Sequence, residues 1–144
     1  MKQIPVIFWT GTGNTQMMAD AIAEAINAAG AEAVVKNVSE ITADEAAGYD
    51  ALALGCPAMG AEVLEECEFE PFFTELEGKL AGKLAGKKVA LFGSYGWGGS
   101  YMQDWEARVK DAGATLVADG VLALGAPDDE AVAKLAEAGK LLAE

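Results

Sequence analysis

The sequence predicts an α/β protein built as a three-layer sandwich, with one five-stranded parallel sheet between two layers of helices. Two observations support this fold class. Strand-like and helix-like segments alternate five times along the 144 residues, and the strand-like segments are apolar throughout, as in strands covered on both faces. Right-handed crossovers leave few topologies, and the order 2-1-3-4-5 is the usual one for five strands. The length suits one domain, so we expect residues 1–144 to form a single domain.

The first half of the chain begins with an apolar strand over residues 4–9 and a helix over residues 14–29. Apolar side chains recur at helical spacing in that helix, and Gly30 stands where a helix-ending glycine belongs. The apolar run 33–35 predicts the second strand. The polar segment 39–48 predicts a helical turn before the third.

The second half repeats this alternation. Buried strands are predicted over residues 51–55 and 89–92, with a helix over residues 68–84 between them. A further helix over residues 103–112 is closed by Gly113.

The C-terminal segment completes the pattern. The fifth strand is predicted over residues 116–124, with an interruption at Asp119 and Gly120. Asp128 is placed to cap a last helix that runs to the C-terminus.

The net charge of the chain restricts the kinds of macromolecule that it can bind. The chain carries 23 acidic and 10 basic residues, a formal net charge of −13. That charge repels nucleic acids and anionic membranes, so we expect neither as a partner and favour redox proteins with basic surfaces. No apolar run approaches the ~20 residues of a membrane span, and the N-terminus lacks a signal-peptide pattern. We therefore expect a cytoplasmic monomer.

The cysteines and the missing histidine limit the site chemistry. Cys56 and Cys67 show no CxxC or zinc-ligand spacing, and the chain contains no histidine. A disulfide scaffold and a His-based metal site are both disfavoured. We interpret the cysteines as two buried thiols, with a single disulfide as the alternative, and we expect no metal.

Three loops follow predicted strands at the carboxyl edge of the sheet, next to the point where the strand order reverses. Open parallel sheets bind their ligands there. The loops are TGTGNT (residues 10–15), CPAMGAE (residues 56–62) and GSYGWGGSY (residues 93–101). All three are rich in glycine or small residues, and their convergence predicts a ligand site.

The first loop enters a helix N-terminus, where backbone N–H groups and the helix dipole favour an anion. It contains no Lys or Arg, so neutral donors would hold that anion. The P-loop pattern is absent, and Gln16 replaces the third glycine of the dinucleotide fingerprint. The alternative is a helix capped by Thr or Asn. Six consecutive small or polar residues exceed what a cap needs, which favours a phosphate group.

The other two loops supply a flat apolar slot. Trp97 stands between Gly96 and Gly98, and Met59 lies in a Pro-Ala-Met-Gly turn. Methionine is often core filler, but here it lies beside the predicted site. A phosphate cradle with a Met/Trp pair suits a planar heterocycle that carries one phosphate. Flavin mononucleotide (FMN) fits that description best.

Three segments together resemble short-chain flavodoxins, particularly the clostridial and related anaerobe type. They are GTGNT, GCPAMGAEVLEECEFEPFF and GKKVALFGSYGWG, in the family's order and spacing. The resemblance spans almost the whole chain and implies a flavodoxin-like fold with non-covalently bound FMN. One departure is Thr10, where the family often has serine, which keeps the hydroxyl.

The resemblance also implies a role for each loop residue. Side chains that would reach the phosphate belong to Thr10, Thr12, Asn14, Thr15 and Ser94. Backbone N–H groups would come from Gly11 and Gly13. On the flavin ring, Trp97 would stack on the solvent-side face, Met59 on the inner face, and Glu62 would hold the pyrimidine imide N–H, while the Gly60–Ala61 peptide would turn toward N5. Further contacts are expected at Pro57, Ala58, Tyr95, Gly96 and Gly98.

In such a protein the flavin performs the redox chemistry and the chain sets its potentials. A second electron would place an anionic hydroquinone beside the phosphate, Glu62 and an acidic surface, so its potential should be low. We expect a low-potential electron carrier that shuttles between semiquinone and hydroquinone, and not an enzyme. The alternative is an FMN-dependent quinone or nitro reductase, which would need a substrate pocket over the face that Trp97 is expected to cover.

Two other activities found on this fold disagree with the residues. A receiver domain needs acidic residues after the first strand, where Trp9 and Thr10 stand. A small tyrosine phosphatase needs Arg six positions after its Cys, and neither Cys56 nor Cys67 has one.

Overall fold

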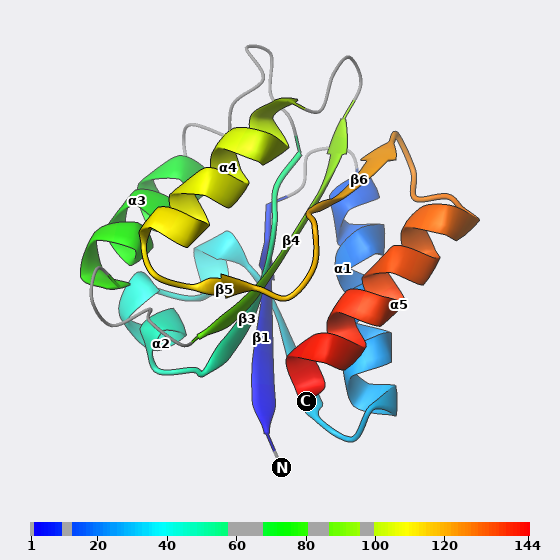
Figure 1. Ribbon diagram of the computed structural model, residues 1–144, viewed down its shortest axis with the longest axis horizontal. Coiled ribbons are helices and arrows are strands. Elements are labelled where there is room, and N and C mark those ends of the chain that lie inside the picture. Colours follow the sequence, from blue (N-terminus) through cyan, green and yellow to red (C-terminus); the bar gives the residue numbers. More distant parts are fainter. Residues whose placement is uncertain (1, 10–12, 58–67, 81–86, 96–99) are drawn as a thin grey trace.

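The computed structural model describes residues 2–9, 13–57, 68–80, 87–95 and 100–144. Helices and strands alternate along these residues (Figure 1). In chain order they are β1 (Gln3–Phe8), α1 (Asn14–Ala28), β2 (Glu32–Asn37), the 3-10 turn η1 (Val38–Glu40), α2 (Ala43–Ala47), β3 (Ala51–Gly55), α3 (Phe69–Leu80), β4 (Lys88–Tyr95), α4 (Ser100–Asp111), β5 (Thr115–Leu116), β6 (Val121–Leu124) and α5 (Asp129–Ala143).

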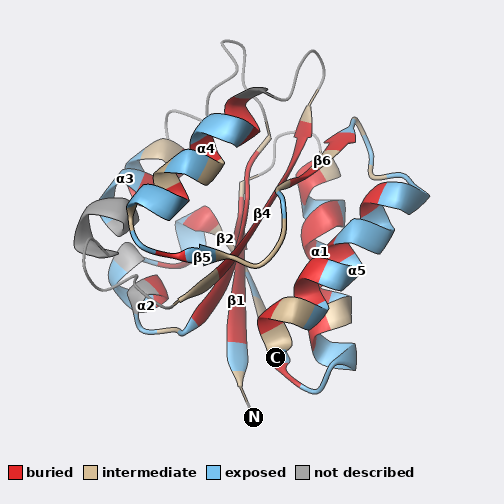
Figure 2. Ribbon diagram, viewed as in Figure 1, coloured by how far each residue is buried: buried red, intermediate tan, exposed pale blue. Residues whose placement is uncertain are grey.

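The strands form one parallel sheet in the order β2-β1-β3-β4-β5, which confirms the predicted topology. Helices α1 and α5 cover one face, and α2, α3 and α4 cover the other (Figure 1). Each face has its own apolar cluster, with Ile22 and Leu135 in one and Phe69 and Trp105 in the other. Buried positions therefore line the strands and the inward sides of the helices (Figure 2).

The fifth predicted strand is divided into β5 and β6, and both pair with β4. The break lies next to α4. The Gly120 N–H donates to Glu106 Oε2 at 2.8 Å, and a Cβ on Gly120 would lie 2.4 Å from Met102 Sδ. The interruption predicted at Asp119 and Gly120 is thus confirmed, and side chains of α4 occupy the space beside it.

The pairing with β6 lengthens β4 beyond the predicted residues 89–92. Ser94 pairs with Ala123 and Tyr95 with Leu124, so Ser94 and Tyr95 belong to the strand. Placing them in a loop was wrong, because the sequence of β4 does not reveal a second partner strand at its end.

The predicted helix ends are confirmed where the structure describes them. Gly30 and Gly113 follow α1 and α4 with φ of 95° and 93°, a conformation that favours glycine. The Asp128 side chain accepts from the Ala131 N–H at 2.8 Å and caps α5. Residues 81–84 of the predicted third helix lie outside the described residues.

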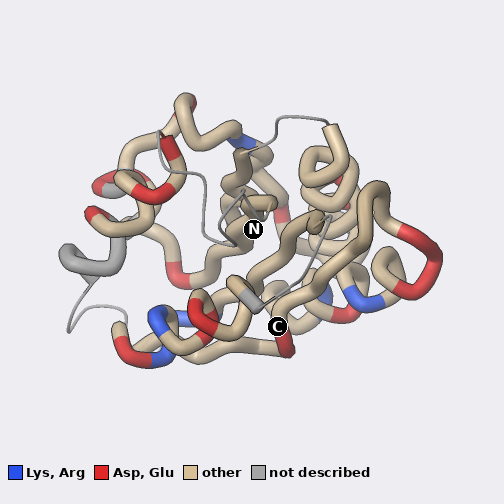
Figure 3. The backbone as a smooth tube through the Cα atoms, turned by 90° about the horizontal axis from the view of Figure 1, so that it is seen from above, with Lys and Arg blue, Asp and Glu red and all other residues tan. Residues whose placement is uncertain are grey.

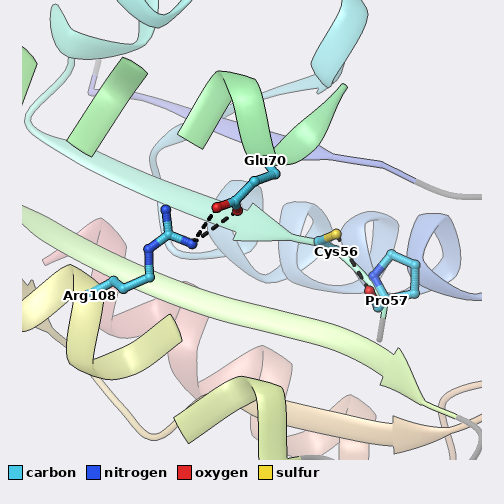
Figure 4. Close-up of polar contacts among 4 residues, drawn as sticks. All are labelled: Cys56, Pro57, Glu70 and Arg108. Atoms are coloured by element: carbon cyan, nitrogen blue, oxygen red, sulfur yellow. Dashed lines mark hydrogen bonds and ion pairs between the residues drawn. The ribbon is translucent and has the colours of Figure 1, made fainter. Parts of the chain in front are cut away.

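An ion pair joins α3 and α4 on one face of the sheet. Arg108 Nη1 lies 3.0 Å from both carboxylate oxygens of Glu70 (Figure 4). Its guanidinium also lies 4.7 Å from the centre of the Phe73 ring. Arg108 of α4 is therefore joined to α3 in two ways, by the ion pair with Glu70 and by a cation–π contact with the Phe73 ring.

Cys56 is buried at the end of β3, and its thiol donates to the Pro57 carbonyl at 3.5 Å (Figure 4). Cys67 lies outside the described residues. No helix in the described part of the chain is long and apolar enough to cross a membrane.

Candidate cofactor site

The predicted site is at the carboxyl edge of β1, β3 and β4. Register places Phe8, Gly55 and Phe92 side by side at this edge. Two backbone hydrogen bonds continue the pairing, from Trp9 N–H to the Gly55 carbonyl at 3.0 Å and from Cys56 N–H to the Phe92 carbonyl at 3.1 Å. The segments after β1 and β3 therefore leave the sheet from neighbouring points, as the sequence predicts.

Helix α1 begins at this same edge (Figure 1). Its N-cap is Gly13, with φ of 94°, a residue that has no side chain to serve as a cap. The alternative of a helix capped by Thr or Asn is therefore wrong. Backbone N–H groups in the first turn of a helix have no intrahelical acceptor and favour an anion.

Thr15 lies in the first turn of α1, at the helix end where the sequence predicts a phosphate group. The residue is only 1% exposed, and its Oγ1 has no hydrogen-bond partner among the residues that the structure describes. An unsatisfied buried hydroxyl costs about 1–3 kcal/mol. A hydroxyl beside helix N–H groups is a suitable donor for phosphate, so the described residues fit a phosphate-bearing cofactor.

Ser94 is buried near this edge, but its hydroxyl already has a partner. Ser94 Oγ donates to the Gly125 carbonyl at 2.7 Å, and Gly125 N–H donates to the Tyr95 carbonyl at 3.1 Å. These bonds join the ends of β4 and β6. Ser94 would have to turn its proton away from Gly125 in order to donate to a phosphate.

The structure describes six of the predicted site residues: Gly13, Asn14, Thr15, Pro57, Ser94 and Tyr95. The others lie outside the described residues: Thr10, Gly11, Thr12, Ala58, Met59, Gly60, Ala61, Glu62, Gly96, Trp97 and Gly98.

Two side-chain contacts at this edge were not predicted. Tyr101 Oη donates to the Cys56 carbonyl at 2.8 Å, and Trp9 Nε1 donates to Glu68 Oε1 at 3.3 Å. Both contacts join positions far apart in the sequence. The sequence pattern predicts Tyr101 at the end of a loop, but Tyr101 is the second residue of α4. A tyrosine in either position gives no sign of a distant acceptor, so the sequence alone could not find the first contact.

The fold and this site together define a class of protein: doubly wound α/β domains that bind a mononucleotide where the strand order reverses. Comparison with known proteins narrows the class. The family model described as Flavodoxin matches residues 6–139.

Individual relatives agree with that match. The flavodoxin of Clostridium beijerinckii is 47% identical over 139 residues, which cover 96% of this chain and 97% of the relative. The flavodoxin of Megasphaera elsdenii is 47% identical over 120 residues, covering 83% and 85%. The solution structure of two-electron reduced Megasphaera elsdenii flavodoxin superposes with a TM-score of 0.86 at 42% identity, covering 97% of this chain and 98% of that chain.

The chain belongs to the flavodoxin family. Members of this family bind FMN and transfer electrons to redox partners; they are carriers rather than enzymes. The resemblance stated from the three motifs is therefore confirmed, and the reductase alternative is not favoured.

Proposed function

We propose that this protein is a low-potential one-electron carrier whose FMN phosphate is held at the N-terminus of α1. The observation that supports this placement is the buried Thr15 hydroxyl without a partner among the described residues. Bound FMN supplies the redox chemistry, and the chain holds it and sets the energy of the added electron.

The charge of the protein supports a low potential. Its formal net charge is −13, and acidic positions occur on both sides of the sheet (Figure 3). Negative charge added near such a surface is disfavoured by Coulomb repulsion. Gly13, Asn14 and Thr15 carry no positive charge. They would hold the phosphate without neutralising it, which leaves its charge to oppose the added electron.

The remaining site residues are proposed in the roles that the family resemblance implies. Thr10, Gly11 and Thr12 complete the phosphate loop; Met59 and Trp97 contact the two faces of the flavin, and Glu62 accepts from the imide N–H. Ser94 joins the phosphate shell only if its hydroxyl leaves Gly125.

The acidic surface also supports the proposal of redox partners with basic surfaces, which electrostatic attraction would bring to the protein.

Within the described part of the chain, the large apolar side chains that are exposed belong to Met17, Val35, Leu124 and Val132. A few exposed apolar side chains of this kind are normal for a monomer, so we propose that the protein is monomeric.

Both apolar clusters pack on one sheet, which supports the proposal of a single domain over residues 1–144. We place this protein in the cytoplasm.

Replacing Thr15 by valine tests the phosphate site. We expect the FMN dissociation constant to rise about tenfold or more, because a hydrogen bond to a charged group contributes about 1.5–3 kcal/mol. The FMN-free protein should keep its stability or gain up to about 1 kcal/mol, since a methyl replaces an unsatisfied buried hydroxyl. Titration of flavin fluorescence and urea denaturation measure the two quantities.

Two controls make this experiment specific. Thr15→Ser keeps the hydroxyl and should bind FMN nearly as the parent does. Riboflavin lacks the phosphate, so the affinity of Thr15→Val for riboflavin should match that of the parent. A variant that binds FMN normally but is less stable would show that the hydroxyl serves the fold and not the cofactor.

Replacing Trp97 by alanine tests the proposed stacking. We expect the dissociation constant of FMN to rise about tenfold or more, because the ring contributes both buried area and stacking. Trp97→Phe keeps an aromatic face and should lose much less. Unchanged FMN affinity in Trp97→Ala, measured by the same titration, would exclude the stacking role.

A further inference from the structure

Two buried hydroxyls lie on the same face of the sheet, near its carboxyl edge. Thr15 and Ser94 are 1% and 6% exposed. Thr15 is three positions before Met18, on the side of α1 that packs in the cluster between the sheet, α1 and α5. Phe92 belongs to the same cluster, and side chains two positions apart in a strand point to one face. Ser94 therefore faces the layer of α1 as well.

The two hydroxyls differ in their hydrogen bonds. Thr15 Oγ1 has no partner among the described residues, whereas Ser94 Oγ donates to the Gly125 carbonyl at 2.7 Å. A serine hydroxyl carries one proton, so it donates to one acceptor at a time. A phosphate oxygen accepts more strongly than a backbone carbonyl because it is charged. A phosphate group at the N-terminus of α1 would therefore compete with Gly125 for the proton of Ser94.

Gly125 directly follows β6 and begins the β6–α5 connection, residues 125–128. Its N–H donates to the Tyr95 carbonyl at 3.1 Å, and its carbonyl accepts from Ser94. The start of the connection is thus tied to β4 by one backbone bond and one side-chain bond. The φ of Gly125 is 71°, and glycine has more backbone freedom than any other residue. The start of the connection should therefore loosen when Ser94 turns away.

This end of β6 lies at the surface of the protein. Leu124, the residue before Gly125, is 68% exposed. The connection leads to three exposed acidic residues at the start of α5, which are Asp128, Asp129 and Glu130. A change of acceptor at the buried Ser94 would therefore reach a surface segment that carries an apolar side chain and three carboxylates.

We propose that Ser94 links FMN binding to the β6–α5 connection: its hydroxyl donates to the Gly125 carbonyl in the FMN-free protein and turns to the phosphate when FMN is bound. This inference rests on the proposed function and adds that cofactor binding loosens the start of the connection. Because Ser94 gives up one hydrogen bond to make another, its hydroxyl should stabilise the FMN-free fold and add little to the affinity. Thr15 gives up no bond and should act in the opposite way.

Amide hydrogen exchange of the full chain tests the link. We expect saturation with FMN to speed exchange of the Gly125 N–H about three- to tenfold, the range of one lost hydrogen bond. Riboflavin, which lacks the phosphate, should not speed it. In Ser94→Ala this amide should exchange fast without FMN, and FMN should add nothing. Ser39→Ala is the matched control, because the Ser39 hydroxyl also donates, to Asn37 Oδ1 at 3.1 Å, but in the exposed turn η1. It should behave as the parent does.

Equilibrium measurements give a second readout. Ser94→Ala should raise the unfolding equilibrium constant of the FMN-free protein about three- to tenfold, measured by urea denaturation. The same variant should raise the FMN dissociation constant by less than about fivefold, measured by flavin fluorescence, because the lost phosphate bond is offset by the Gly125 bond that binding no longer breaks. Thr15→Val should show the opposite pattern, with lost affinity and no loss of stability.

The outcomes separate this inference from the proposed function. If FMN leaves exchange at Gly125 unchanged or slows it, but binds more tightly than riboflavin, the link is wrong and the proposed phosphate site stands. If riboflavin speeds exchange as much as FMN does, the phosphate is not the cause and the link is again wrong. A Ser94→Ala variant with unchanged stability and a tenfold loss of affinity would make Ser94 a phosphate ligand without the link. If the parent binds no FMN, both proposals fail.

Discussion

Replacing Trp105 by alanine is expected to destabilise the FMN-free protein by about 3–5 kcal/mol, the usual cost of removing a large buried aromatic side chain. Trp105 is 1% exposed. Its ring meets Phe69 and Phe73 edge-on, with centres 5.5 Å and 5.9 Å apart. Alanine would leave a cavity between α3, α4 and the sheet. Urea denaturation measures the loss, and the melting temperature should fall by roughly 10 °C or more.

Trp105→Phe is the matched control for this prediction. The indole Nε1 is buried and has no hydrogen-bond partner among the described residues, so phenylalanine removes an unsatisfied donor together with some volume. Removal of the unsatisfied donor offsets much of the cost of the lost volume, so we expect the stability to fall by no more than about 1 kcal/mol. A loss as large as that of Trp105→Ala would show that the core requires the whole indole and that a smaller aromatic ring does not replace it.

Replacing Gly93 by alanine is expected to cost about 3 kcal/mol, at the upper end of what overpacking usually does. The added Cβ would lie 2.2 Å from the Cys56 carbonyl oxygen. That oxygen belongs to the backbone directly after β3, next to the central strands, and cannot rotate away as a side chain could. Strands β3 and β4 would have to separate at the edge where the cofactor is proposed to bind. We therefore also expect at least a tenfold loss of FMN affinity, measured by fluorescence titration.

Two further variants show whether crowding at this edge is the cause. Gly48→Ala makes the same substitution at a glycine with φ of −78°, where the nearest atom to an added Cβ is 3.3 Å away. It should change stability by no more than about 0.5 kcal/mol. A Cβ on Gly93 would meet two oxygens, Tyr101 Oη and the Cys56 carbonyl oxygen. The double variant Gly93→Ala/Tyr101→Phe removes the first of them. We therefore expect its loss of stability to be smaller than the sum of the losses of the two single variants. Full additivity would contradict the proposed crowding.

Patterns over a few neighbouring residues predicted those strands, helix ends and caps that depend on residues close together in the sequence. The apolar runs of β1 and β3, the helix-ending Gly30 and Gly113, and the cap at Asp128 all depend on residues a few positions apart. The strand order follows because right-handed crossovers and fully apolar strands leave few alternatives. The end of β4 was missed because its extension depends on β6, a strand almost thirty residues away.

For the candidate site, too, the sequence predicted some features and the structure was needed for others. The first loop suggested phosphate by composition alone, and a cap by Thr or Asn remained open until Gly13 was seen to occupy the N-cap. Burial decided the significance of Thr15, because a hydroxyl in the sequence does not reveal whether a partner surrounds it. Likewise the family resemblance predicts that Ser94 contacts the phosphate, but in the structure the Ser94 hydroxyl donates to the Gly125 carbonyl.

The sequence by itself determined the layered α/β fold, the order of the sheet, the family and thereby the cofactor, because these follow from hydrophobic pattern and from motifs read along the chain. Only the tertiary structure decided that the Thr15 hydroxyl lacks a partner among the described residues, that β6 extends the edge of β4, and that Tyr101 donates to the Cys56 carbonyl. These features depend on contacts between segments distant in sequence. Such contacts exist only after the chain has folded, so no local pattern encodes them.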